Sequence, residues 1–414
     1  MMSADERFDI DRSAAKPANY GEGMSGTNLE RAGDHNQRVT LQAVRANGPI
    51  TRADLAQITG LTAPAIANIT KRLLDDNMIL KAGRLLGGRG QPATKLVVNP
   101  DGAFSIGLNI DRDHIAVVAL DFEGKVRARI SREVHFAMPD EVVAFFKAAI
   151  EQIRHDHAIN FERLIGIGIG MPDDLGRVRL PNRPEAYEVW SEINVAELFG
   201  SILNVPVSLE NDATAAAIGE MQFGHGLQTA SFIYTLISAG LGGGLVINGH
   251  YFRGTHGRSG EIGFLPIVRQ TPDGTQTPAS LQDAVSLYAL YAHLNAAGHA
   301  VSTPADLDNL PPEGLSVIDD WIEKAASYLH DPFLTLSCAI NPEAHYIGGR
   351  LPATVIEKLC ARLNEAYAKL SDRVPKIAPV TRAALAVNSA AMGAAILPFN
   401  ERFLPIREAL MKTA

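Results

Sequence analysis

The sequence predicts an α/β protein in which a small, basic N-terminal module precedes a larger body built from two similar α/β units. The chain has 414 residues, 46% of them hydrophobic and 20% charged, a composition typical of soluble, core-forming proteins of two to three domains. Residues 35–100 contain nine basic and three acidic residues, a net charge of +6, whereas the rest of the chain carries −14. After residue 100, a pattern of strand, tight turn and strand occurs twice, about 125 residues apart. These observations define the expected division of the chain.

The composition also excludes several classes of protein. The most apolar stretch, residues 232–247, is 16 residues long and interrupted by glycines, whereas a membrane-spanning helix needs about 20 apolar residues. Acidic residues near the N-terminus stand where a signal peptide needs an apolar core. The two cysteines, Cys338 and Cys360, form neither a disulfide framework nor a four-cysteine zinc site. We therefore expect a cytoplasmic protein that does not associate with membranes.

The N-terminal part of the basic segment predicts a flexible stretch followed by a helix. Residues 1–34 are polar and lack an apolar period, so we expect them to be flexible, with order beginning near Asn36. Val39, Leu41 and Val44 then support a helix. This helix should end at residues 47–49, Asn-Gly-Pro, because glycine and proline terminate helices.

Two further helices have clear start signals. Thr51 is placed to cap the second helix, with Asp54 at its third position. Gly60 then provides a tight turn, and Thr62 caps the third helix, whose apolar residues recur at three- and four-residue spacing. Two short strands around a glycine-rich tip follow, at residues 78–98. Helix, turn, helix and wing together predict a winged helix-turn-helix domain over residues 35–100.

The third helix and the wing carry the residues expected to contact double-stranded DNA. Small side chains at the start of the helix allow the backbone to approach base edges, Asn68 can bond to them, and basic residues neutralise phosphates. Arg89, between two glycines, suits a narrow minor groove. An accidental cluster of charges, or a helical hairpin used only for dimerisation, is the alternative; neither needs a glycine-flanked arginine. The predicted DNA-contacting residues are Thr62, Ala63, Ala65, Asn68, Lys71, Arg72 and Arg89.

The body of the chain predicts two lobes with a ligand cleft between them. The first unit has expected strands at residues 104–110, 114–121, 125–134 and 164–170 and a helix at 140–155. The second begins near residue 231 with a strand, a glycine loop (Ser238–Gly244), a strand, and an Asn248-Gly249 turn, a strong hairpin signal. The expected domains are 1–34 (flexible segment), 35–100 (winged helix-turn-helix), 101–225 (lobe 1), 226–385 (lobe 2) and 386–414 (a C-terminal helix that returns to lobe 1).

Several motifs in the body resemble the signature of the ROK family (repressor, open reading frame, kinase). They are LISAGLGGGLVINGHYFRGTHGRSGEIGF at 236–264, LENDATAAAIGE at 209–220, LPNRP at 180–184 and NPEAHYIGG at 341–349. The GGRGQP run of the wing resembles the transcriptional-regulator branch of the family. The resemblance covers roughly residues 26–400 and implies a two-lobed, actin-like fold of the hexokinase type (RNase H-like), with a sugar between the lobes and a homodimeric or homotetrameric assembly.

The resemblance also implies a set of sugar-binding residues. Asn211 and Asp212 match the family's sugar-contacting pair, and Asp212 aligns with the catalytic base of the kinases; capping the helix that follows is its structural alternative. Glu261 matches a sugar-binding glutamate, and Asn182 lies on a loop near the expected cleft. Phe264 and Gln282 stand where the family has a histidine and a further glutamate. With the cysteine-rich zinc segment also absent from the sequence, we expect no metal and no cofactor, and an altered, less acidic sugar site.

Phosphoryl transfer is not expected from this chain. The kinases of the family carry an Asp-x-Gly-Gly-Thr phosphate loop, whereas this sequence has Asn109, Asp111, Arg112 and Asp113 at the matching positions. Charged side chains there would break the backbone cradle on which phosphoryl transfer depends. The resemblance therefore implies a sugar-responsive regulator of carbohydrate genes that binds operator DNA without being an enzyme. A degenerate or bifunctional sugar kinase, and a DNA-binding protein whose body only dimerises, are the alternatives.

Overall fold

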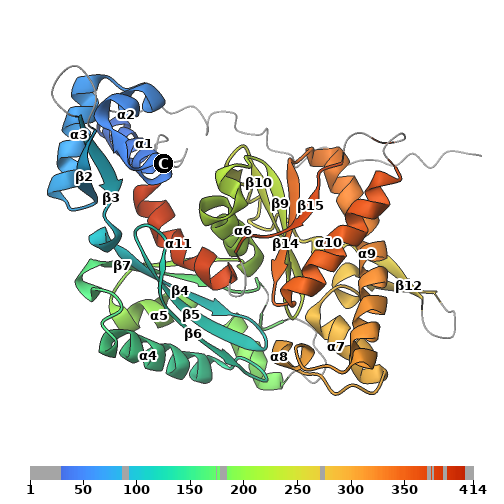
Figure 1. The fold of residues 1–414 in the computed structure, drawn as a ribbon. Helices are drawn as coiled ribbons and strands as arrows, with labels where there is room; N and C mark the ends of the chain where they lie inside the picture. The colour runs from blue at the N-terminus through green and yellow to red at the C-terminus, as the bar shows by residue number, and fades with distance from the viewer. Residues whose placement is uncertain are drawn as a thin grey trace, which may run out of the picture.

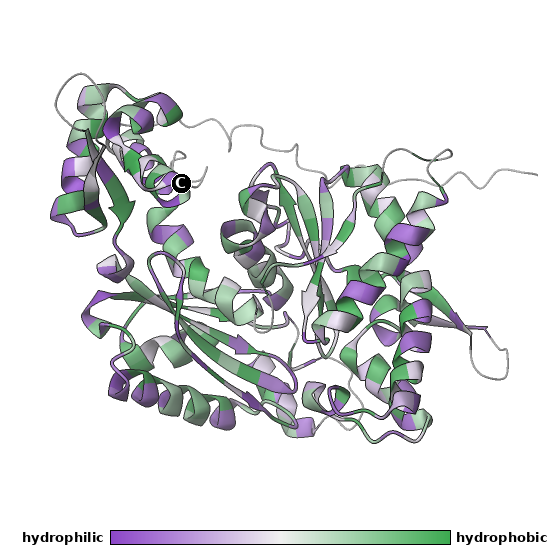
Figure 2. Cartoon of the chain, in the orientation of Figure 1, coloured by the Kyte–Doolittle hydropathy of each residue, from purple (hydrophilic) through white to green (hydrophobic). Residues whose placement is uncertain are grey.

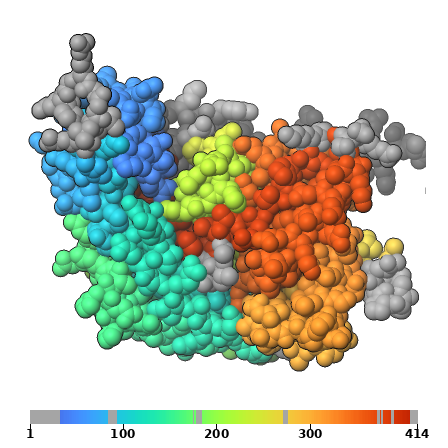
Figure 3. Space-filling view, in the orientation of Figure 1, coloured from blue at the N-terminus to red at the C-terminus, as the bar shows by residue number. Residues whose placement is uncertain are grey.

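The computed structural model describes residues 29–85, 93–173, 175–177, 184–270, 276–370, 374, 377–385 and 389–405. Figure 1 shows a small N-terminal domain above a lobe built on one sheet, with a second lobe beside them. In the space-filling view of Figure 3 the N-terminal domain and lobe 1 form one side of the molecule and lobe 2 the other. No helix in the described ranges is long and apolar enough to cross a membrane.

The N-terminal domain is the predicted winged helix-turn-helix. Its helices are α1 (Leu29–Asn47), α2 (Arg52–Thr59) and α3 (Ala63–Asp75), and its strands β1 (Ile50–Thr51), β2 (Ile79–Leu85) and β3 (Ala93–Val98) pair in the order β1-β3-β2. Thr51 and Asp54 form a capping box on α2, Gly60 ends that helix at φ +69°, and Thr62 caps α3. These start and stop signals are confirmed.

The first helix starts earlier than predicted. α1 begins at Leu29 rather than near Asn36, so residues 29–34 are helical, and only residues 1–28 of the expected flexible segment lie outside the described residues. Adding residues to an existing helix costs little compared with forming its first turn. The helix is fixed by its buried residues Leu41 and Val44, and it therefore extends through polar residues that show no apolar period.

Lobe 1 is built on a five-stranded sheet with the order β6-β5-β4-β7-β8. The strands are β4 (Phe104–Ile110), β5 (His114–Asp121), β6 (Val126–Glu133), β7 (Leu164–Gly170) and β8 (Val207–Glu210). The first three are antiparallel, and β7 and β8 continue in parallel. Helices α4 (Pro139–His155) and α5 (Val195–Leu203) cover one face. The predicted strands and helix are confirmed to within a residue at each end.

Lobe 2 repeats this topology. Its sheet has the order β11-β10-β9-β14-β15, made of β9 (Phe232–Ile237), β10 (Leu241–Ile247), β11 (His250–Tyr251), β14 (Ala344–Gly349) and β15 (Val380–Arg382). Asn248 and Gly249 both have positive φ, 54° and 74°, as the predicted hairpin requires. The outer elements are α7 (Leu287–Ala296), α8 (Pro304–Leu307), α9 (Pro312–Ile340), α10 (Ala353–Ala368) and the β12 (Pro266–Gln270)–β13 (Gln276–Ser280) hairpin.

Short 3₁₀ helices lie in the connections of the described chain, at Pro100–Gly102, Phe161–Arg163, Glu185–Ser191, His225–Leu227, Ile262–Phe264 and Leu281–Asp283.

Two longer helices join the lobes. The last helix, α11 (Ser389–Phe403), packs on the lobe 1 sheet, and α6 (Asp212–Phe223) packs on both α11 and β10. A Cβ atom at Gly107 or Gly168 would collide with the α11 backbone, so glycine allows this close approach.

The expected glycine loop of lobe 2 is shorter than predicted. β10 begins at Leu241, so Gly242–Gly244 lie within the strand, and only Ser238–Gly240 form the turn. A Cβ atom at Gly242 would stand 2.7 Å from the Cβ of Ala213, and one at Gly244 would overlap Ala217, both on α6. These glycines are therefore required because a helix packs directly on the strand, a contact that the local sequence does not reveal.

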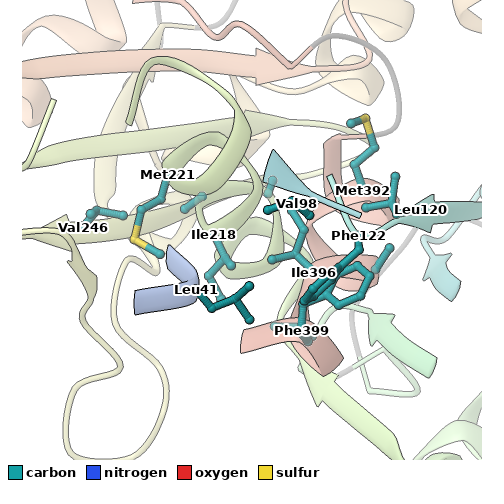
Figure 4. Close-up of a cluster of buried hydrophobic side chains, with 14 of the residues drawn as sticks. Leu41, Val98, Leu120, Phe122, Ile218, Met221, Val246, Met392, Ile396 and Phe399 are labelled. Carbon is teal, nitrogen blue, oxygen red and sulfur yellow. The ribbon is translucent and has the colours of Figure 1, made fainter. Parts of the chain in front are cut away.

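One hydrophobic cluster joins the DNA-binding module to both lobes. Figure 2 shows apolar residues along the central strands and polar residues on the outward faces of the helices. In Figure 4, Leu41 of α1 lies near Ile218 and Met221 of α6, and Phe122 lies near Phe399 of α11. The N-terminal domain is thus packed against the body.

Candidate functional site

The main candidate site is a hollow of about 480 Å³, open to solvent, between the two lobes. Of the six residues predicted to bind a ligand, five line it, and Asn182 lies outside the described residues. The five are spread over 71 residues of sequence, from Asn211 to Gln282, so only the fold brings them together. The lining residues are Arg112, Pro172, Asp173, Asn211, Asp212, Ser238, Gly240, Leu241, Gly242, Arg258, Glu261, Phe264 and Gln282.

One wall of the hollow is the N-terminus of α6. Asn211 is the N-cap, and its Oδ1 accepts hydrogen bonds from the backbone N–H groups of Ala213 (3.0 Å) and Thr214 (3.2 Å). The predicted structural alternative for Asp212, capping this helix, is therefore wrong: Asp212 is the first helical residue. Its Oδ1 accepts from the N–H of Ala213 at 2.8 Å.

Asp212 is an unusual carboxyl group because it is only 8% exposed. Burial, with the negative charge of Asp111 as the second cause, raises its pKa to about 7. Near neutral pH the carboxyl group therefore exists in both protonation states. It can accept a hydrogen bond from a hydroxyl group or donate one to it.

The opposite wall comes from lobe 2. Gly260 has φ +85° and precedes Glu261, which begins the short 3₁₀ helix Ile262–Phe264. Arg258 donates to Glu261 Oε1 at 3.2 Å and lies 3.9 Å from Asp173 Oδ2. Neither Arg258 nor Asp173 was predicted from the sequence. Arg258 could have been found from its spacing of three residues from Glu261, which allows the two side chains to pair. Phe264, 60% exposed, gives this wall an apolar end.

The turn between β4 and β5 enters the site from lobe 1. Asp111, Arg112 and Asp113 are all buried, at 1%, 8% and 8% exposure. The Arg112 side chain reaches across to lobe 2, where a Cβ atom on Gly240 would stand 2.5 Å from its Nη1. The guanidinium group therefore lies against the turn Ser238–Gly240, in space that glycine leaves open.

A second arginine ties the lobes together beside this turn. Arg350 follows β14 of lobe 2, and its Nη1 donates to Asp113 Oδ1 at 2.7 Å. Its Nη2 donates to both oxygens of Glu133 at 2.5 Å. His114 Nδ1 lies 3.1 Å from Glu133 Oε1. Burial, followed by the charge of Asp111, raises the pKa of Asp113 to about 6, against the opposing effect of Arg350.

The histidines of the body do not gather at the site. Within the described ranges, no group of three or more His, Cys, Asp and Glu side chains is placed to hold a metal ion. His250 and His256 are exposed. His345 is fully buried; it stacks on Phe333 and hydrogen-bonds Ser337.

The second candidate site is the exposed face of α3. Ile66, Ile69 and Leu73 are buried against the domain core, which turns the opposite face of the helix to solvent. On that face Thr62, Ala63, Asn68, Lys71 and Arg72 are exposed and Ala65 is half-buried. Arg89 lies in residues 86–92, outside the described ranges. This face has the composition of a recognition helix.

Two basic residues of the N-terminal domain face the body instead. Arg45 Nη2 hydrogen-bonds Gln222 Oε1, and its guanidinium lies 4.7 Å from the ring centre of Phe223, both at the end of α6. Burial lowers the pKa of Arg45 to about 10, so it stays charged at neutral pH. Arg38 donates to the carbonyl oxygens of Glu401 and Leu404 at 2.8 and 3.1 Å. Part of the predicted basic surface is therefore a contact between domains.

Comparison with known proteins agrees with both halves of this architecture. The profile of the ROK family matches residues 105–401, and a profile for winged helix-turn-helix DNA-binding matches residues 34–79. The uncharacterized protein y4fQ of Sinorhizobium fredii is 29% identical over 89% of this chain and 91% of its own length. The xylose repressor of Bacillus spizizenii is 31% identical; the match spans 56% of this chain and 60% of that repressor. A crystal structure of a ROK family transcriptional regulator, a homolog of the E. coli MLC protein, superposes with a TM-score of 0.65 at 21% identity, covering 92% of this chain and 98% of that one.

Proposed function

Because the chain belongs to the ROK family and has a winged helix-turn-helix domain ahead of the family's two lobes, we propose that it is a sugar-responsive, DNA-binding transcriptional repressor of carbohydrate genes. The exposed face of α3 binds operator DNA, and the hollow between the lobes binds a sugar or sugar derivative. The similarity to a xylose repressor supports this class of function. The protein acts in the cytoplasm as a homodimer or homotetramer, which matches two operator half-sites.

The single observation that carries the proposal is the position of α6. Its first turn forms a wall of the hollow through Asn211 and Asp212. Its last turn holds Gln222 and Phe223 against Arg45 of α1. A helix of 12 residues is about 18 Å long and moves as a rigid unit. A ligand that shifts the start of α6 therefore also shifts the surface on which the DNA-binding domain rests.

Two elements, one from each lobe, pack on α6 and are affected by such a shift. Glycines at 242 and 244 bring β10 of lobe 2 against α6, and Gly393 brings α11 of lobe 1 against it. Closure of the lobes around a ligand changes how these surfaces meet. The ligand then favours one arrangement of the DNA-binding domains over the other, and operator affinity changes by the free-energy difference, typically about 1–3 kcal/mol.

The competing function, sugar phosphorylation, is supported by Asp212 in the position of a catalytic base. It is opposed by two arginines of the cleft, Arg112 and Arg350. Arg112 fills the space beside Gly240 where a phosphate group would approach the turn. Arg350, paired with Asp113 and Glu133, closes the cleft beside β14. Because phosphoryl transfer depends on positioned phosphates and their metal ion, the protein senses its sugar without phosphorylating it.

Operator binding measured with and without a panel of monosaccharides and their derivatives tests this function. The DNA probe is taken from the region upstream of the gene, and affinity is followed by fluorescence anisotropy. We expect one class of sugar to change operator affinity by about 5- to 150-fold, and the Asp212→Asn variant to respond less. If no sugar changes the affinity, the sensing function is wrong. ADP release with a sugar and ATP, lost in Asp212→Asn, would instead establish the kinase.

A further inference from the structure

Arg112 is a buried cation that forms no side-chain hydrogen bond or salt bridge with the described residues. The residue is 8% exposed, and its Nε is a buried donor that has no hydrogen-bond acceptor. Within the described ranges, no carboxylate oxygen forms a salt bridge with it at 4 Å or less. A guanidinium group stays charged at all relevant pH values, and burying it without a hydrogen-bonded counter-charge is costly.

The other arginines of the cleft are all paired, which makes Arg112 the exception among the described cleft residues. Arg350 contacts two carboxylates, Arg258 contacts Glu261, and Arg253 Nη2 lies 2.6 Å from Glu210 Oε2. Asp111 adjoins Arg112 in the chain, and the charges of both residues act on Asp212. Asp111 Oδ1 accepts the backbone N–H of Arg112 itself at 2.8 Å, and Asp212 Oδ1 accepts that of Ala213 at the same distance.

Arg112 also occupies the inner end of the ligand space. It lines the hollow, and it lines a larger groove of about 2910 Å³ that runs on between α7, α9 and the β12–β13 hairpin. Gly240 and Gln282 line both as well. On its lobe 1 side is Tyr187, whose hydroxyl group is another buried donor without a partner. Arg112 Nε and the Tyr187 hydroxyl group are therefore two buried donors without an acceptor among the described residues, with the charges of Asp111 and Asp113 nearby.

Other residues of the hollow provide hydrogen-bond acceptors. Asp212, Glu261 and Gln282 present carboxylate and amide oxygens to the hollow, which suits sugar hydroxyl groups. A molecule that bonds both to these acceptors and to Arg112 carries hydroxyl groups and a negatively charged acceptor group. The planar fork of a guanidinium group matches the two oxygens of a phosphate or carboxylate.

We propose that Arg112 binds an anionic group of the effector, so that the effector is an acidic sugar, either a sugar phosphate or a sugar carboxylate. This inference rests on the proposed sensing function and specifies its ligand. Arg258 offsets part of the negative charge of Glu261 and Asp173 in the hollow. Asp212, whose pKa burial raises to about 7, takes up a proton as the anion approaches.

The test is calorimetric titration of the full-length protein with matched neutral and acidic probes. The probes are glucose, glucose 6-phosphate and glucuronate, N-acetylglucosamine and its 6-phosphate, xylose and xylonate, inorganic phosphate, and ATP. We expect at least one acid to bind ten or more times tighter than its neutral parent. Comparison of the sugar phosphates with the sugar carboxylates shows which of the two acidic groups the site binds.

Substitution at the arginine completes the test. Arg112→Gln should weaken binding of that acid by about 10- to 100-fold, since a hydrogen bond to a charged group contributes about 1.5–3 kcal/mol, and should weaken binding of its neutral parent by much less. Arg112→Lys keeps the positive charge but loses the planar fork of the guanidinium group, so its affinity for the acid should lie between those of the wild type and Arg112→Gln. Arg269→Gln, an exposed arginine of the neighbouring groove, is the matched control and should change nothing. Thermal unfolding checks that each variant is folded.

The possible failures are distinguishable. If a neutral sugar changes operator affinity and no acid binds more tightly than its neutral parent, the anion site is wrong and the sensing function stands. If acids, including inorganic phosphate, show no Arg112-dependent binding, the anion site is equally wrong. ATP binding tighter than every sugar acid would also overturn it. If no sugar of either kind changes operator affinity, the sensing function fails, whatever anion Arg112 binds.

Discussion

Replacing Arg45 should uncouple the sugar site from the DNA-binding domain. The side chain joins α1 to the end of α6 by a charge-assisted hydrogen bond to Gln222 and by its approach, 4.7 Å, to the ring of Phe223. The hydrogen bond contributes about 1.5–3 kcal/mol and the cation–π contact about 0.5–2 kcal/mol. Arg45→Ala therefore removes about 2–5 kcal/mol from this junction, at least as much as the coupling free energy expected of a regulator, about 1–3 kcal/mol.

The assay is operator affinity with and without the effector sugar. For the wild type the two values should differ by about 5- to 150-fold, and in Arg45→Ala their ratio should fall toward one, with the sugar still binding. Arg72→Ala, on the exposed face of α3, is the matched control: it should weaken operator binding in both conditions and leave the ratio unchanged. Thermal unfolding gives a readout without ligand, since the weakened junction should separate the DNA-binding domain into its own transition. If Arg45→Ala keeps the wild-type ratio of operator affinities and unfolds in a single, unchanged thermal transition, the coupling through α6 is refuted.

Three further predictions concern stability and DNA binding. The pKa of Asp212 is raised from an ordinary 3.8 to about 7, so between these pH values the native state holds a proton that the unfolded chain lacks, and stability increases as the pH falls from about 7 toward 4. Asp212→Asn should flatten this increase, which melting temperatures measured from pH 4 to 8 would show. Identical slopes for the variant and the wild type would contradict the prediction. Arg350→Ala leaves the carboxylates of Asp113 and Glu133 without their shared partner, which should lower the free energy of unfolding by about 3 kcal/mol in denaturant titrations. Arg350→Lys should recover part of this loss. A loss below about 1 kcal/mol would show that the lobes do not depend on this contact. Lys71→Ala should lower affinity for operator and unrelated DNA alike and reduce the slope of log affinity against log salt by about one; an unchanged slope would remove Lys71 from the DNA interface.

The sequence by itself determined the local architecture of this protein. Thr51, Gly60 and Thr62 act on backbone groups within a few residues of themselves, so helix boundaries can be predicted from the neighbouring sequence. The Asn248-Gly249 turn is equally local, because it requires only two residues with positive φ. Motifs in the body also indicated Asn211, Asp212, Glu261, Phe264 and Gln282, which the fold gathers in one hollow.

The tertiary structure decided which partners these residues meet. Asn211, and not Asp212, caps α6, because the backbone direction at the helix start selects one of two adjacent polar side chains. Arg45 contacts the body across 177 residues of sequence, and Gly242 is required by a helix packed on its strand. Arg112 has charge but no local partner, and it reaches Gly240 only because the lobes face each other. Hydrogen bonds within a turn leave a signal in the adjoining residues, whereas packing between distant segments depends on how whole sheets and helices come together.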